Sequence, residues 1–109
     1  MRSALVAMAL VLTFPALAQD APMTAVADLR PNADVTVSGA VLRITDDDEF
    51  ILGDATGEVQ VYLSSGSMPV QPDQAVTVMG RVDDDGPIEL YARTLTLPDG
   101  TVLTFAPDW

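Results

Sequence analysis

A short apolar motif occurs twice in this chain, and it constrains the fold more than any other feature of the sequence. Residues 35–41 read Val-Thr-Val-Ser-Gly-Ala-Val, and residues 76–82 read Val-Thr-Val-Met-Gly-Arg-Val. Alternating valines are typical of a strand with one buried face. A glycine inside such a pattern marks a bulge, a corner or a close approach of two backbones. The repeat therefore predicts two strands that bend at Gly39 and Gly80.

Each copy of the motif leads into three consecutive aspartates and then into another strand-like segment. The acidic turns are Asp46–Asp48 and Asp83–Asp85, and the segments that follow them are Glu49–Leu52 and Ile88–Tyr91. Two bent strands that each feed a hairpin are what a small closed β-barrel requires.

The apolar alternation and the turn residues predict six strands, over residues 35–44, 49–53, 58–63, 75–82, 88–97 and 101–105. In the first of them the apolar phase shifts to Leu42 and Ile44, which indicates a bulge or a strand shared between two halves of the sheet. Residues 64–74 read as a loop.

A short helix over Ala25–Leu29, capped by Thr24, is expected before the first strand. The predicted fold is thus all-β: a small closed OB-fold-like barrel of five to six strands with a short N-terminal helix. Another small β-barrel or a truncated sandwich is the alternative.

The first 18 residues have the pattern of a secretory signal peptide. Arg2 precedes an apolar run from Ala4 to Phe14, and Ala16-Leu17-Ala18 places small residues where a signal peptidase reads. The run is shorter than the roughly 20 residues of a membrane span. We expect cleavage after Ala18 and a periplasmic protein that is not membrane-embedded; a retained amphipathic anchor is the alternative. The expected division is signal peptide 1–18, N-terminal segment 19–33 and barrel 34–109.

Charge and composition restrict the function. The full chain carries a net charge of −11, and loss of Arg2 with the signal peptide would leave four arginines against 16 acidic residues. Such a chain repels nucleic acid and anionic membranes, so a charged partner should be cationic. With neither cysteine nor histidine, the chain has no disulfide framework, no thiol or imidazole catalyst, and no zinc, copper or iron site of the usual nitrogen and sulfur type. We expect no cofactor and no enzyme activity.

The chain also resembles a known family. The motif around Gly39, the segment Glu49–Val61 and the run Gly80–Asp83 resemble the bacterial OB-fold (BOF) family of small exported proteins, the YgiW/YdeI-type stress-tolerance proteins. The turn Asp54–Gly57 is the sharpest element of the likeness. Two departures are Gly53, where members often carry a basic residue, and Ser64-Ser65-Gly66, where they tend to carry lysines and a tryptophan. The resemblance implies a periplasmic OB barrel linked to stress tolerance that binds a small or cationic ligand; it brings no catalytic residues.

In an OB barrel, ligands usually lie on the face of the second and third strands, between the loops that join strands 1–2 and 4–5. This rule predicts that both acidic turns rim one cleft, above a floor that includes Gln60, Arg81, Tyr91 and Arg93. The candidate ligand-binding residues are Asp46, Asp47, Asp48, Glu49, Tyr62, Asp83, Asp84 and Asp85. Solvated turns are the plainer interpretation of such acid runs. Neither run has the spacing of a calcium loop, so no metal site is predicted and only weak divalent association stays open.

A second group of residues is expected to be structural. Asp54 should accept hydrogen bonds within its own turn from the backbone near Thr56 and Gly57, with Gly57 free to adopt a positive φ. Gly39 and Gly80 are the bend positions.

Two functions remain open at this stage. One is a stress-linked module that binds a small or cationic ligand at the acidic rim. The other is an interaction module that docks on an envelope protein through a sheet edge or through the face of Tyr62 and Tyr91. A weaker third interpretation is an accessory domain whose acidity only keeps it soluble.

Overall fold

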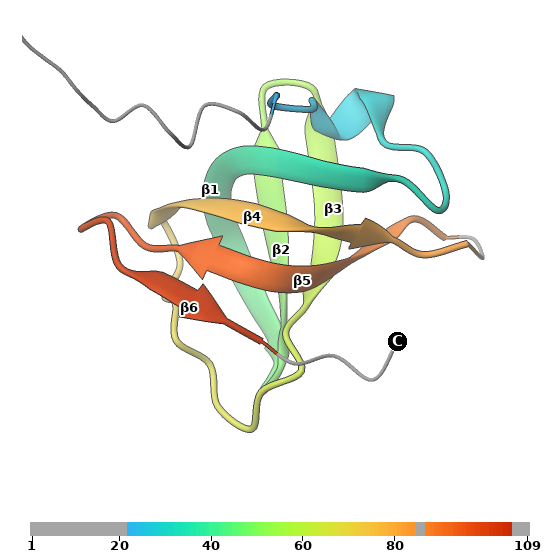
Figure 1. Ribbon diagram of the computed structural model, residues 1–109. Coiled ribbons are helices and arrows are strands. Elements are labelled where there is room, and N and C mark those ends of the chain that lie inside the picture. Colours follow the sequence, from blue (N-terminus) through green and yellow to red (C-terminus); the bar gives the residue numbers. More distant parts are fainter. Residues whose placement is uncertain (1–21, 85–86, 106–109) are drawn as a thin grey trace, which may run out of the picture.

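The structure is a computed structural model, and it describes residues 22–84 and 87–105. Six strands form one sheet in the order β3-β2-β1-β4-β5-β6, and an additional pairing of β3 with β5 closes the first five into a barrel (Figure 1). The strands are β1 (Asp34–Asp46), β2 (Glu49–Asp54), β3 (Gly57–Tyr62), β4 (Ala75–Val82), β5 (Glu89–Thr96) and β6 (Val102–Thr104). The predicted all-β barrel is confirmed. The predicted signal peptide, residues 1–18, and Asp85 lie outside the described residues.

Strand β1 is shared between the two halves of the barrel. Its first part, residues 34–40, pairs with β4, and its second part, residues 40–46, pairs with β2. A register shift between Val41 and Arg43 marks the predicted bulge. The apolar residues beyond it are not buried, because Leu42 and Ile44 remain 39% and 37% exposed. Leu42 instead covers Gly53, where a Cβ atom would meet its side chain.

The two glycines of the repeat allow backbones to approach closely. A Cβ atom on Gly39 would overlap the carbonyl oxygen of Gly53 on β2, and one on Gly80 would overlap the carbonyl oxygen of Tyr91 on β5. Backbone cannot yield as a flexible side chain can, so both positions require glycine.

The two copies of the repeat pair with each other. In the antiparallel β1–β4 ladder Val37 lies opposite Val78, while Gly39 lies opposite Val76 and Val35 opposite Gly80. The repeats are therefore related by a local two-fold axis near the Val37–Val78 pair, and the two glycines lie on opposite sides of that axis.

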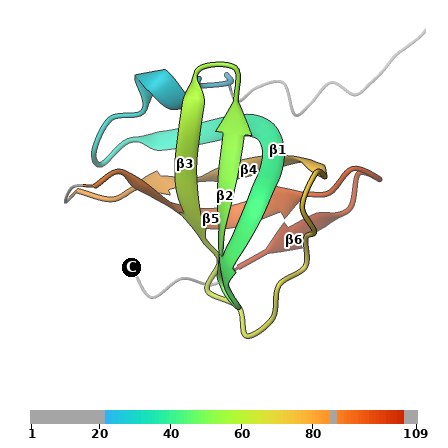
Figure 2. The same cartoon turned by 180° about the vertical axis from the view of Figure 1, so that it is seen from behind.

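The core fills the barrel interior with residues from every one of its five strands. Among the described residues, fifteen hydrophobic ones are buried: Val35, Val37, Val41, Phe50, Leu52, Val59, Val61, Leu63, Val70, Val76, Val78, Val82, Leu90, Ala92 and Leu95. The connection between β3 and β4 closes one end of the barrel (Figure 2), since Val70 is buried there and Asp73 donates a 2.7 Å backbone hydrogen bond to Val41.

The expected N-terminal helix is only a single turn of 3-10 helix, Val26–Asp28, and Thr24 does not cap it. The reason is tertiary: the backbone amides of Val26 and Ala27 donate to Asp54 and Thr56 in the β2–β3 turn, and the Thr24 amide donates to the Thr36 carbonyl. These bonds hold the segment against the barrel in place of a longer helix. Within the described residues no helix has the length and apolarity to cross a bilayer.

Candidate functional site

A row of paired residues crosses the outside of the barrel from strand to strand. Neighbouring members are direct partners in the ladders, so their side chains leave the sheet on the same face. In order, the row consists of Asp46, Glu49, Tyr62, Tyr91, Arg81 and Asp34. The register thus brings together residues that are up to 57 positions apart in the sequence.

Two half-buried tyrosines occupy the middle of this row. Tyr62 and Tyr91 are partners in the parallel β3–β5 pairing, and their rings meet edge to face with centroids 5.6 Å apart and planes at 89°. This arrangement is favourable for aromatic pairs. It also leaves aromatic surface available beside the neighbouring carboxylates.

Carboxylates surround the tyrosine pair. The Tyr91 hydroxyl lies between two carboxylates and shares its one proton between Asp83 at 3.4 Å and Glu89 at 3.3 Å. Burial, reinforced by the charges of Glu89 and Asp83, raises the pKa of Tyr91 to about 12. Glu49 accepts a 2.6 Å hydrogen bond from the Gln60 amide. The pKa of Glu49 is raised by burial and then by the like charges of Glu89, Asp48 and Asp46. The face is therefore crowded with negative charge.

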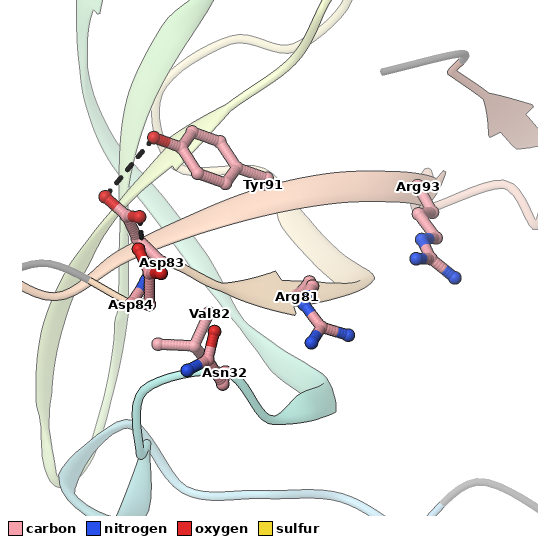
Figure 3. A pocket seen from close by; sticks show the side chains of 7 residues that line it. All are labelled: Asn32, Arg81, Val82, Asp83, Asp84, Tyr91 and Arg93. Atoms are coloured by element: carbon pink, nitrogen blue, oxygen red, sulfur yellow. Dashed lines mark hydrogen bonds between the residues drawn. The ribbon is translucent and has the colours of Figure 1, made fainter. Parts of the chain in front are cut away.

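A groove of about 280 Å³ lies beside Tyr91, and Figure 3 shows the side chains that line it. Arg81 and Arg93 lie at one end, and Asp83, Asp84 and the Tyr91 hydroxyl lie at the other (Figure 3). Val82 forms part of the wall. Asn32 completes the groove and has a φ of 66°, with its amide hydrogen-bonded to the Val82 carbonyl at 3.0 Å.

The two acidic turns do not have the same surroundings. Asp83 and Asp84 line the groove, whereas Asp46, Asp47 and Asp48 lie on the separate β1–β2 turn at the end of the barrel that is lower in Figures 1 and 2. The carboxylate oxygens of those three aspartates lie within 4.8 Å of one another. They could gather a hydrated divalent cation, but exposed aspartates also cluster without one.

Sequence reasoning missed two residues of this site, Glu89 and Asn32. Glu89 could have been found from the alternation Glu89, Tyr91, Arg93, which places all three on one face of β5. For Asn32 the sequence indicates only that asparagine is a residue type that tolerates a positive φ, which does not place it in a site.

Asp54 makes the hydrogen bonds expected of a turn residue. Its Oδ1 accepts from the amides of Thr56 at 2.7 Å and Gly57 at 3.1 Å and from the Thr56 hydroxyl, while Oδ2 accepts from Val26. These bonds, led by the Thr56 hydroxyl, lower the pKa of Asp54 to about 2. The expected positive φ at Gly57 is wrong: Gly57 continues the ladder opposite Asp54, and among the described glycines only Gly100 has a positive φ.

Comparisons with known proteins agree on this architecture. A family model described as bacterial OB fold (BOF) protein matches residues 14–90. A solved structure, that of the hypothetical protein ygiW from E. coli, superposes with a TM-score of 0.60 at 25% sequence identity, covering 70% of this chain and 89% of that one. No curated protein matches the chain.

Proposed function

Because the chain belongs to the bacterial OB-fold family, we propose that it is a periplasmic binding protein that holds a small organic cation on the Tyr62–Tyr91 face. Membership of the family and the fold support a binding protein over an enzyme. Export is supported by the signal-peptide pattern of residues 1–18. A role in stress tolerance is supported by the resemblance to the YgiW/YdeI-type proteins.

One observation carries the proposal: an edge-to-face tyrosine pair with carboxylates on both sides. Glu49 lies directly opposite Tyr62 in the β2–β3 ladder, and Asp83 and Glu89 reach the Tyr91 hydroxyl. An ammonium group is attracted both by carboxylates and by the electron-rich face of an aromatic ring. These groups come from β2, β3, β5 and the start of the β4–β5 connection, so the barrel fixes their arrangement before any ligand binds.

The charge of the protein favours the same ligand. The like charges that raise the pKa of Glu49 are relieved when a cation binds among them. The aspartates of the β1–β2 turn would add attraction at longer range, which salt screens over about 10 Å at 0.1 M ionic strength. Single-stranded nucleic acid, a frequent OB-fold ligand, requires the opposite charge in its groove.

The proposal is tested by calorimetry of residues 19–109 with putrescine, spermidine and hexylamine at low and moderate salt. We expect saturable binding that weakens at least about tenfold in a Glu89→Gln, Asp83→Asn double variant, because hydrogen bonds to charged groups contribute about 1.5–3 kcal/mol. The matched control is Asp28→Asn with Glu58→Gln, which removes the same charge away from the tyrosines. Equal weakening in both double variants would contradict a site at Tyr91.

Docking on an envelope protein is the second candidate, and strand β6 favours it. Within the described part of the chain, β6 has a strand neighbour on one side only, and Val102 is 57% exposed. Such an edge can accept a strand from another protein. The Phe105 amide donates to the Arg93 carbonyl on β5. Because successive backbone amides of a strand point to opposite sides, the Thr104 amide points away from β5. Thr104→Pro, which removes this amide, should therefore abolish binding of an envelope protein at β6, while cation binding and the Tm stay unchanged.

A further inference from the structure

The groove beside Tyr91 contains a concentration of positive charge that a site for cations alone does not explain. Outside the predicted signal peptide the chain has four arginines, and two of them, Arg81 and Arg93, line this one groove. Arg81 and Arg93 come from neighbouring strands, β4 and β5, and their guanidinium groups lie on the same side in Figure 3. In a protein with 16 acidic residues, the pair brings two guanidinium groups to one end of the groove.

The opposite end of the groove is anionic. Asp83 lies there with its carboxylate between the Tyr91 hydroxyl and the Asp84 amide, at 3.4 Å and 2.8 Å. Glu89 accepts from the same hydroxyl. Arg81 makes its ion pair in another direction, with Asp34 at 3.3 Å, and both side chains of that pair remain substantially exposed, at 40% and 68%. An exposed pair of this kind contributes little, so Arg81 can turn to a ligand at low cost.

We propose that this groove binds a small zwitterion, with the ammonium at Asp83, Glu89 and Tyr91 and the carboxylate at Arg81 and Arg93. The ammonium half rests on the proposed function, and the carboxylate half is new. Guanidinium groups match a carboxylate in charge and in planar hydrogen-bond geometry. The Asn32 side chain, between the two ends, offers both a donor and an acceptor.

The size and polarity of the groove select against other ligands. A volume of about 280 Å³ lies just below the range of roughly 300–1,000 Å³ of drug-sized sites, so the groove is large enough for an amino acid and small for a drug-sized ligand. A diamine that lay along the groove would place a like charge against Arg81 and Arg93, whereas on the Tyr62–Tyr91 face its ammonium groups meet carboxylates. A purely anionic ligand in the groove would place a like charge against Asp83 and Asp84. Mismatched charges of this kind are costly and give specificity.

The test compares ω-amino acids with amines that lack the carboxylate. Binding of β-alanine, γ-aminobutyrate and ε-aminocaproate is measured by calorimetry at pH 7, each against its counterpart ethylamine, propylamine or pentylamine. Long-range attraction by this acidic protein favours the amines, which carry net positive charge. We nevertheless expect at least one zwitterion to bind about tenfold more tightly than its amine, because of the charged hydrogen bonds at the arginine end.

Variants separate the two halves of the site. In an Arg81→Gln, Arg93→Gln double variant the preference for the zwitterion should fall to about one, while amine binding is retained or strengthened. Arg43→Gln, which removes an arginine paired with Glu58 on another face, should leave the preference unchanged. Thermal unfolding of each variant checks that the barrel remains folded.

Each outcome has a distinct meaning. If every zwitterion binds no more tightly than its amine, or if the preference persists without both arginines, the zwitterion proposal is overturned and the cation site stands. If neither class binds and putrescine does not bind either, the proposed function fails as well.

Discussion

The two acidic turns follow the same motif in the sequence but have different surroundings in the structure. Asp46–Asp48 connect β1 to β2 in a tight turn, where Asp47 donates its amide to the Asp46 carboxylate and Asp46 and Asp47 are exposed. Asp83 and Asp84 begin the β4–β5 connection beside Tyr91, Arg81 and Asn32. The difference shows that the neighbouring strands, and not the aspartates themselves, decide which groups surround an acidic turn.

The glycines that precede the two turns should be equally indispensable, and this is the largest effect that we expect. Gly39→Ala and Gly80→Ala each drive a Cβ atom into backbone, so each should lower the free energy of unfolding by about 3 kcal/mol or more. Gly66→Ala is the control, because nothing lies within 4 Å of a Cβ atom there. Urea unfolding midpoints measure all three. If Gly39→Ala or Gly80→Ala left the free energy of unfolding unchanged, the two repeats would not be equivalent.

The second prediction separates the turns by function. Neutralising Asp83 and Asp84 to asparagine should weaken putrescine binding about tenfold, or ~1.4 kcal/mol. Neutralising Asp46, Asp47 and Asp48 removes more charge but should weaken it only about two- to threefold, and that smaller loss should disappear at high salt. Calorimetry at two ionic strengths decides the matter. If neutralising Asp46, Asp47 and Asp48 weakened putrescine binding more than neutralising Asp83 and Asp84, the cation site would lie at the β1–β2 turn.

The third prediction compares the turns that end the two hairpins. Asp54 and Asp99 both accept hydrogen bonds from backbone amides of their turns, and these bonds lower the pKa of each. A carboxyl whose pKa falls from 3.8 to about 2 on folding stabilises the folded state above pH 4 and loses that effect as the pH falls through 2. Asp54→Asn should therefore lower the Tm at pH 7 but not at pH 2.

Asp99→Asn is the matched variant for this comparison. It should show the same pH dependence with a smaller change, because Asp54 also binds the N-terminal segment through Val26. An equal effect of both variants on the Tm would mean that the bond to Val26 contributes nothing.

The smallest expected effect concerns Glu49, the first residue after the β1–β2 turn. The pKa of Glu49 is raised on folding, chiefly by burial and by Glu89. Its negative charge therefore destabilises the folded state above the ordinary pKa of 4.5, and well below that pH the carboxyl is neutral and has no such effect. Glu49→Gln should raise stability at pH 7 by about 0.3 kcal/mol and leave it unchanged at pH 3. Destabilisation at pH 7 would show that the bond to Gln60 outweighs the repulsion.

Local patterns were sufficient to predict most of the fold. The valine alternation located β4 at its observed bounds, Ala75–Val82. The glycines of the repeat predicted the close backbone approaches that the structure shows at Gly39 and Gly80. The short N-terminal helix was predicted in the right place, but it is only one turn of 3-10 helix. It does not extend further because its amides bind Asp54 and Thr56, almost 30 residues away. Such partners leave no local signal.

The site was harder to predict than the strands. Tyr62 and Tyr91 could be nominated as outward residues, but their contact depends on the parallel β3–β5 register, which links segments 29 positions apart. Glu89 joins the site through the same register, opposite Gln60. The collection of Arg81 and Arg93 beside Asp83 likewise follows from how the barrel closes and not from any motif.

The closure of the barrel has a consequence for how a bound ligand could be detected. The β3–β5 ladder has only three pairs: Gln60–Glu89, Val61–Leu90 and Tyr62–Tyr91. Such a narrow seam is where transient opening of the barrel should begin. A ligand bound by Tyr62 and Tyr91 would contact both β3 and β5 and so would hold the two strands together. Binding of the ligand should therefore slow amide hydrogen exchange at Val61 and Leu90, although the side chains of these two residues lie inside the barrel and do not contact the ligand.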